Sequence, residues 1–147
     1  MSGAAIPVAF PPVADMLPHR APMVLLDEIV AAGPGYATCR VEIRQSSTFA
    51  ENGRVPGLVA IEYMAQTVGV YAGLKARHQG LPVRIGYLLG SRDVVLPGED
   101  FRVGDVLEVE ARHQFGDEAI GAFDCAVRRR GQVVASGCLN VFQGDGK

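Results

Sequence analysis

Hydrophobic and polar positions alternate along the chain with two different periods, which predict where its strands and its helix lie. In the run 36–44, apolar residues from Cys39 onward alternate with charged ones, the period of two expected of a half-buried strand. The apolar run 23–30 is expected to pair with this strand across a turn at 31–35. Four further strands are expected, between turns rich in Gly, Pro and Asp, at residues 83–96, 106–115, 119–129 and 132–142.

The longest apolar stretch predicts a helix from about Pro56 to His78, with Gly80 ending it. Pro56 suits the first helical turn, where no backbone N–H is needed. Few polar residues occur before Lys75, so the helix is expected to be buried on nearly every side. The resulting order, β-β-α-β-β-β-β, predicts an α+β fold in which an antiparallel sheet wraps around one long central helix.

The 147 residues are expected to form a single domain, residues 1–147. Within it, residues 1–12 are expected to be an irregular lead-in, 13–17 one helical turn and 45–54 a loop. Apolar residues make up 48% of the chain and charged residues 20%, a composition that excludes an intrinsically disordered protein. The net charge of -2 gives no broad basic field, so nucleic-acid binding is not expected.

The sequence predicts neither membrane insertion nor a metal centre. No apolar run reaches the ~20 residues of a membrane-spanning helix without an intervening Gly, Pro or charged residue. The N-terminus lacks the basic region of a signal peptide. Three cysteines, Cys39, Cys125 and Cys138, form no C-x-x-C pair and are expected to be buried thiols in a reducing cytoplasm. The three histidines have no metal-ligand spacing, so no metal and no cofactor is expected.

One carboxylate, Glu62, interrupts the apolar helix and is the strongest candidate for chemistry. In apolar surroundings, desolvation raises the pKa of such a group toward values useful in acid/base catalysis. Gln66 follows one helical turn later on the same face, where it could hold the carboxylate or a bound water. An exposed position for Glu62, or a salt bridge to an arginine, is equally compatible with the composition alone.

Several motifs, in order, resemble the hotdog-fold 3-hydroxyacyl-ACP dehydratases of fatty-acid synthesis. Residues 17–27 (LPHRAPMVLLD) are similar to that family's opening segment, and residues 56–66 (PGLVAIEYMAQ) to its central-helix signature. Residues 86–90 (GYLLG) resemble the strand beside its acyl tunnel, and 97–98 and 103–105 resemble the turns that follow. The resemblance spans about 126 of the 147 residues, from Leu17 to Phe142.

The loop before the helix departs from this pattern. Family members carry Gly-His-Phe-Pro there, and its histidine is the catalytic partner of the helix carboxylate. Here the loop 49–57 reads FAENGRVPG, shorter and without histidine. It resembles the ApeP-like branch, which is associated with aryl-polyene-type polyketide clusters. The acid/base pair of the family is therefore not carried over whole.

The resemblance implies a cofactor-free dehydration of a 3-hydroxyacyl thioester, presented on the phosphopantetheine of an acyl carrier protein, to the trans-2-enoyl thioester. The reaction requires a base, an acid and donors for the thioester oxygen. Glu62 and His19 are the expected catalytic residues. The Gly57 amide, unpaired within the helix at the positive end of its dipole, is expected to bind the thioester oxygen. Gln66 and Gly86 are expected to contact substrate.

Other polar residues have weaker assignments. His19 has an alternative role in fixing the N-terminal turn against the helix. His78 is expected to interact with the helix dipole, and His113 to face solvent or pair across strands. Tyr63 is expected in a subunit contact or the tunnel wall. Asn52 could replace the missing histidine or form a turn. Candidate contacts with the carrier protein are Arg84, Arg92 and Arg128–Arg130.

Two other functions compete with dehydration. A hotdog thioesterase uses a carboxylate on the same helix to direct water at the carbonyl, so the fold alone does not distinguish it. A non-catalytic, acyl-binding partner of another hotdog dehydratase is the second alternative, because the loop histidine is missing. Since hotdog monomers expose an edge strand and an open tunnel, at least a homodimer is expected, with a hetero-oligomer as the alternative.

Overall fold

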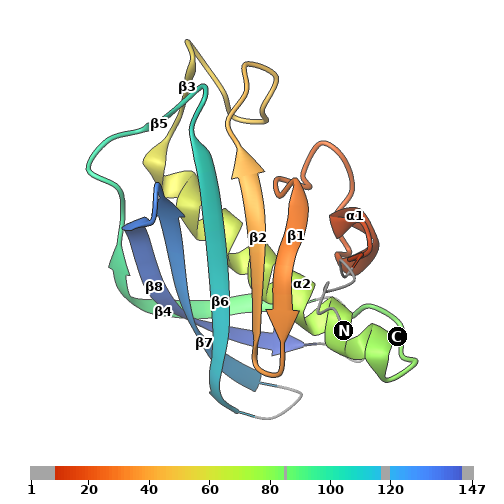
Figure 1. Ribbon diagram of the computed structural model, residues 1–147. Helices are drawn as coiled ribbons and strands as arrows, with labels where there is room; N and C mark the ends of the chain where they lie inside the picture. The colour runs from red at the N-terminus through yellow and green to blue at the C-terminus, as the bar shows by residue number, and fades with distance from the viewer. Residues whose placement is uncertain (1–8, 85, 117–119, 144–147) are drawn as a thin grey trace, which may run out of the picture.

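A computed structural model describes residues 9–84, 86–116 and 120–143 of the chain (Figure 1). Six antiparallel strands, in the order β1-β2-β6-β7-β8-β4, form a sheet that curves around one long helix, α2 (Ala60–His78). The predicted α+β architecture, a sheet wrapped around a central helix, is confirmed. The strands of this sheet are β1 (Glu28–Gly33), β2 (Tyr36–Glu42), β4 (Gly86–Val95), β6 (Val106–Gly116), β7 (Ile120–Arg129) and β8 (Gln132–Gln143).

Both ends of the central helix follow from the sequence. A single 3-10 turn, η1 (Gly57–Val59), precedes α2, and Pro56 stands just before it with φ -54°. At the other end Gly80 has φ 72°, a left-handed conformation that suits glycine. The Gly80 N–H donates to the Arg77 carbonyl at 3.1 Å and the Leu81 N–H donates to the Ala76 carbonyl at 2.8 Å. These bonds form a Schellman motif, which satisfies the last carbonyls of the helix.

The core lies between α2 and the concave face of the sheet. The strand β2 alternates buried and half-buried residues along its whole length, as its sequence predicts. From α2, Met64, Thr67 and Val70 are fully buried against the sheet. The three cysteines are buried free thiols, as expected.

Ionisable side chains in this core make the fold sensitive to alkali. Burial raises the pKa of Cys39 and of Cys125 to about 12. The pKa of Tyr63 is also raised to about 12, mainly by burial and to a smaller extent by the negative charge of Asp27. Above about pH 9 the unfolded chain loses these thiol protons while the folded chain keeps them, so the free energy of unfolding falls as pH rises. Each thiol contributes a slope of about 1.4 kcal/mol per pH unit there.

We therefore expect urea denaturation to give a constant free energy of unfolding between pH 7 and 8 and a steep decline above pH 9. A variant with Cys39→Ala and Cys125→Ala is the control, and its decline should be shallower. Equal slopes for the two proteins above pH 9 would show that the buried thiols are not responsible.

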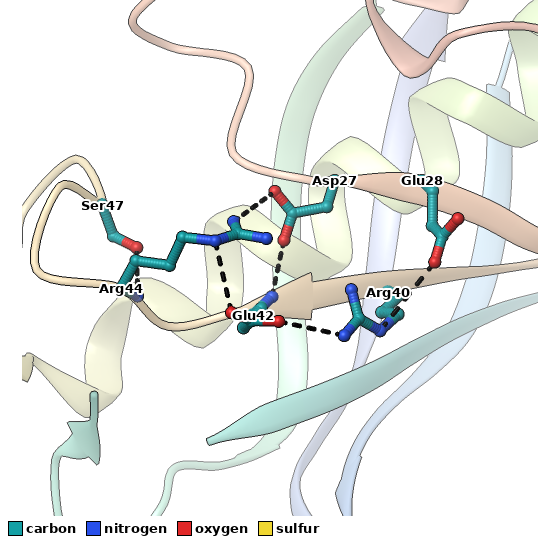
Figure 2. Close-up of polar contacts among 6 residues, drawn as sticks. All are labelled: Asp27, Glu28, Arg40, Glu42, Arg44 and Ser47. Carbon is teal, nitrogen blue, oxygen red and sulfur yellow. Dashed lines mark hydrogen bonds and ion pairs between the residues drawn. The ribbon is translucent and has the colours of Figure 1, made fainter. Parts of the chain in front are cut away.

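The predicted strand 23–30 is wrong over its first half, because β1 begins only at Glu28. The preceding segment is held by the Gln66 side chain and by Asp27, which bonds to β2 through both its backbone and its carboxylate, instead of by a regular ladder. Asp27 donates its N–H to the Arg40 carbonyl at 2.9 Å, and its carboxylate accepts the Glu42 N–H at 2.6 Å. The other carboxylate oxygen binds Arg44 at 3.1 Å, within a chain of alternating charges (Figure 2). The Asp27 side chain thus takes the place of the next backbone pair of a ladder.

Three short elements complete the fold. Helix α1 (Val13–Met16) is the single turn expected near residues 13–17, and it packs on α2. Strands β3 (Arg54–Val55) and β5 (Phe101–Arg102) pair with each other and were not predicted. Two-residue strands are too short to show a period, so the sequence gives no signal for them. Of the expected lead-in, residues 9–12 have no regular structure, and residues 1–8 lie outside the described residues.

Candidate active site

A cavity of about 220 Å³ runs along one face of the central helix. The lining residues of α2 recur with the helical period from Glu62 to Ala76, and its C-cap Gln79 lines the cavity too. Half of those between Glu62 and Gln79 are alanine or glycine. Strands β4, β6, β7 and β8 supply the facing wall, which includes Leu88, Phe123 and Val141. The lining of this groove is more apolar than polar, and Glu62 and His19 both contribute to it.

Gln66 holds the Glu62 carboxylate in place. Its Nε2 donates to Glu62 Oε1 at 3.1 Å and to the Met23 carbonyl at 2.7 Å, while its Oε1 accepts the Leu25 N–H at 3.0 Å. Because Oε1 must accept from a backbone N–H, the amide has only one orientation that satisfies every partner. Gln66 is 1% exposed, and the predicted hydrogen bond to the carboxylate is confirmed.

His19 faces the same carboxylate from the segment that follows α1. Its Nε2 lies 3.7 Å from Glu62 Oε1, beyond hydrogen-bond length. Its Nδ1 is buried and has no hydrogen-bond partner within the described ranges. The structure thus brings together the two predicted catalytic residues, which stand 43 positions apart in the sequence.

The surroundings of Glu62 differ from the expected apolar burial. Its side chain is 40% exposed, because the cavity opens beside it. Of the two competing interpretations, an exposed position is met in part, whereas an arginine salt bridge does not occur: within residues 9–84, 86–116 and 120–143 the ion-pair partner of Glu62 is His19. In this chain the Glu62 carboxylate is therefore reached by solvent and is also contacted by Gln66 and His19.

The expectation that the Gly57 amide is free to receive a substrate oxygen requires a correction. The Gly57 N–H donates to Asp100 Oδ1 at 3.2 Å, so the amide expected to receive a thioester oxygen already has a partner. Gly57 lines a different cavity, whose other walls include Leu58, Pro97 and Asp100. Asp100 follows the Pro97-Gly98 turn, and sequence spacing alone gives no sign that this turn reaches the start of the helix. A role for Gly57 in substrate binding stays a prediction.

Comparison with known proteins identifies the family. The ApeP-like family, described as ApeP dehydratase, matches residues 11–147. This chain belongs to the ApeP-like family. Two relatives are 3-hydroxyacyl-[acyl-carrier-protein] dehydratases FabZ. The one from Psychromonas ingrahamii is 29% identical over 133 residues, which cover 86% of this chain and 87% of that protein. The one from Psychrobacter arcticus is 30% identical over 139 residues, covering 89% and 93%.

Solved structures agree with this ApeP-like assignment. A chain of the dehydratase heterocomplex ApeI:P from Xenorhabdus doucetiae superposes with a TM-score of 0.88 at 32% identity, over 93% of both chains. A hypothetical thioesterase from Streptococcus pneumoniae, solved with coenzyme A, has a TM-score of 0.62 at 16% identity and covers 82% of this chain and 89% of its own. The second likeness shows the shared hotdog fold alone.

His113 confirms one of its two expected placements. It stands opposite Phe123 across β6 and β7, so it pairs across strands, and it does not face open solvent but lines the same cavity as Glu62. Its ring stacks on Tyr71 with centroids 6.4 Å apart and lies 5.1 Å from the ring of Phe123. The strand period indicates this inward-facing position, since His113 lies on the same side of β6 as Val109 and Ala111, which are fully buried.

The other candidates of this ApeP-like chain lie as follows. Gly86 and Arg84 line the cavity, while Tyr63 is buried against Phe101 with ring centroids 5.9 Å apart. Tyr63 is therefore a core residue, and the prediction of a subunit contact or tunnel wall is wrong. Asn52 has φ 54°, which supports the turn-forming alternative. His78 is the last, exposed residue of α2.

Of the proposed carrier-protein contacts, two have acidic partners within this chain. Arg128 lies 4.0 Å from Glu110 and Arg129 lies 3.2 Å from Asp105. In the part of the chain that the structure describes, no cluster of three or more His, Cys, Asp or Glu is placed to hold a metal. None of its described helices is long and apolar enough to span a membrane.

Proposed function

We propose that this chain dehydrates a 3-hydroxyacyl thioester, carried by an acyl carrier protein, to the trans-2-enoyl thioester. The observation that carries the proposal is the cluster of Glu62, His19 and Gln66 at the edge of an apolar groove. Membership of the ApeP-like dehydratase family and the similarity to FabZ enzymes support it. An acyl chain suits the groove because most of the groove's lining surface is apolar.

The two ionisable groups divide the proton transfers between them. One removes a proton from Cα, and the other protonates the hydroxyl leaving Cβ, so that water and the enoyl thioester are formed. Glu62 and His19 are 3.7 Å apart, close enough to reach neighbouring carbons of one substrate. Gln66 acts as a positioning residue, since its amide points the Glu62 carboxylate toward the cavity and binds no reacting atom.

A second hotdog subunit is proposed to cover the open edge of the sheet. Among the strands of the described residues, β4 pairs with β8 alone and forms an edge of the sheet, and eight of its ten residues are exposed. Its exposed side chains include Tyr87, Leu88 and Leu89. Large apolar side chains on an unpaired edge strand mark a protein contact. The similar ApeI:P structure is itself a heterocomplex, which supports a hotdog partner, identical or different.

Purified chain incubated with a 3-hydroxyacyl carrier protein tests these proposals. Mass spectrometry of the carrier protein should reveal the enoyl product, with a mass decrease of one water. Free 3-hydroxy acid would instead identify a thioesterase and contradict the assignment. Turnover that occurs only after a second hotdog subunit is added would assign this chain to a hetero-oligomeric dehydratase.

A further inference from the structure

Two glycines lie one turn apart in the interior of α2, at positions 69 and 73. Glycine in a helix interior destabilises the helix by about 0.5–1 kcal/mol relative to alanine. Neither residue has a positive φ, so conformational freedom does not explain them. What they share is the close approach of the segment that leads to His19.

The approach is strictest at Gly73. A Cβ placed there would overlap the carbonyl oxygen of Met16 and lie 3.0 Å from both the carbonyl carbon and the Cα of that residue. These are backbone atoms, and they move only if α1 moves. At Gly69, in contrast, a Cβ would meet Leu17 Cδ2 at 2.8 Å, the end of a side chain that can rotate. Gly73 therefore sets how closely α1 can lie on α2.

The link from Met16 to His19 is short and stiff. Leu17 is extended, with φ -120° and ψ 149°, and only 5% exposed. Pro18 fixes its own φ and restricts the residue before it to extended conformations. A displacement of Met16 is consequently passed on to His19 rather than absorbed between them.

We propose that Gly73 is a positioning residue for the active site. By carrying no side chain, it lets the Met16 carbonyl rest on the helix, and the rigid Leu17-Pro18 link then places His19 opposite Glu62. This inference rests on the proposed catalytic roles of His19 and Glu62. Gly73 itself touches no substrate and does not line the cavity.

Gly73→Ala is expected to lower kcat by about 10- to 100-fold, because a displacement near 1 Å can cost that much, while KM changes little. Arg77→Ala is the control, because the Arg77 side chain is exposed on the same helix and does not line the cavity. Its kcat should equal that of the wild type. A kcat within twofold of the wild type for Gly73→Ala would overturn the proposal.

A double-mutant cycle separates positioning from general damage. If Gly73 acts through His19, then Gly73→Ala should cause no further loss of kcat in a His19→Ala background. Multiplicative losses would overturn the proposal. If Gly73→Ala does not fold, Pro18→Gly replaces it in the cycle, since it loosens the link and leaves the helix unchanged. Its loss of kcat should likewise vanish in the His19→Ala background.

A readout independent of turnover distinguishes failure of this inference from failure of the proposed function. In NMR spectra, the His19 ring resonances should shift in Gly73→Ala, or in Pro18→Gly, and stay unchanged in Arg77→Ala. A wild-type protein without dehydratase activity would contradict the proposed function while this shift still supports the positioning of His19. If the wild-type protein is active and the His19 resonances of Gly73→Ala equal those of the wild type, the inference is overturned and the proposed function stands.

Discussion

Glu62→Gln is expected to lower the kcat of enoyl formation by about 10³-fold, the range found when a general acid or base is removed. Glutamine has the same shape, and its Oε1 still accepts the hydrogen bond from Gln66 Nε2. What the variant loses is the ability to give or take a proton. Steady-state kinetics with a 3-hydroxyacyl carrier protein measures the effect.

The matched control is Glu108→Gln, which neutralises an exposed carboxylate of β6 away from the cavity. Its kcat and its circular dichroism spectrum should equal those of the wild type. Glu62→Gln should have the same spectrum, because no contact within the core changes. If Glu62→Gln keeps near-normal turnover, the carboxylate is not part of the chemistry.

Gln66→Leu is expected to lower both stability and turnover. Leucine fills a similar volume at this buried position but leaves the Leu25 N–H and the Met23 carbonyl, both partly buried, without their partner. Each unsatisfied group costs about 1–3 kcal/mol, so the free energy of unfolding should fall by about 2–4 kcal/mol. The released Glu62 carboxylate should lower kcat by at least tenfold.

Thr67→Val is the control for this variant, because Thr67 is equally buried and adjacent on the helix. Its hydroxyl donates to the Tyr63 carbonyl, within the helix, at 2.9 Å, and its side chain also hydrogen-bonds to the Cys39 thiol in the core. Urea denaturation should show a loss of about 1 kcal/mol or less, with kcat unchanged. Equal losses in the two variants would mean that Gln66 does not connect the segments of the site.

The long elements could be predicted because each repeats one pattern over many residues. The helix 56–78 and the strand 132–142 match η1 with α2 (Ala60–His78) and β8 (Gln132–Gln143) closely. The segment 23–27 could not be separated from β1, since its apolar residues look the same whether they bond to a strand or to Gln66. The decisive partner lies 41 residues away from Leu25, beyond any local pattern.

The candidate site likewise contains contacts that local spacing predicts and contacts that it does not. Glu62 and Gln66 share a helix face, so their contact follows from helical spacing. The approach of His19 depends on how α1 packs on Gly73, which involves no periodic signal. The pairing of the Gly57 amide with Asp100 depends on a turn whose path is set by the short strands β3 and β5. Tertiary contacts of this kind are not encoded in neighbouring residues.

The open edge of β4 also has a consequence for how the protein must be produced. One edge of the ten-residue strand β4 has no strand partner within the described residues, and large apolar side chains of the same strand are exposed. Such an edge recruits any extended peptide, including other unfolded copies, into non-native sheets. Newly made chains are therefore expected to aggregate least when the hotdog subunit proposed above is already abundant. Co-expression with that subunit should raise the yield of dispersed protein more than any change of buffer.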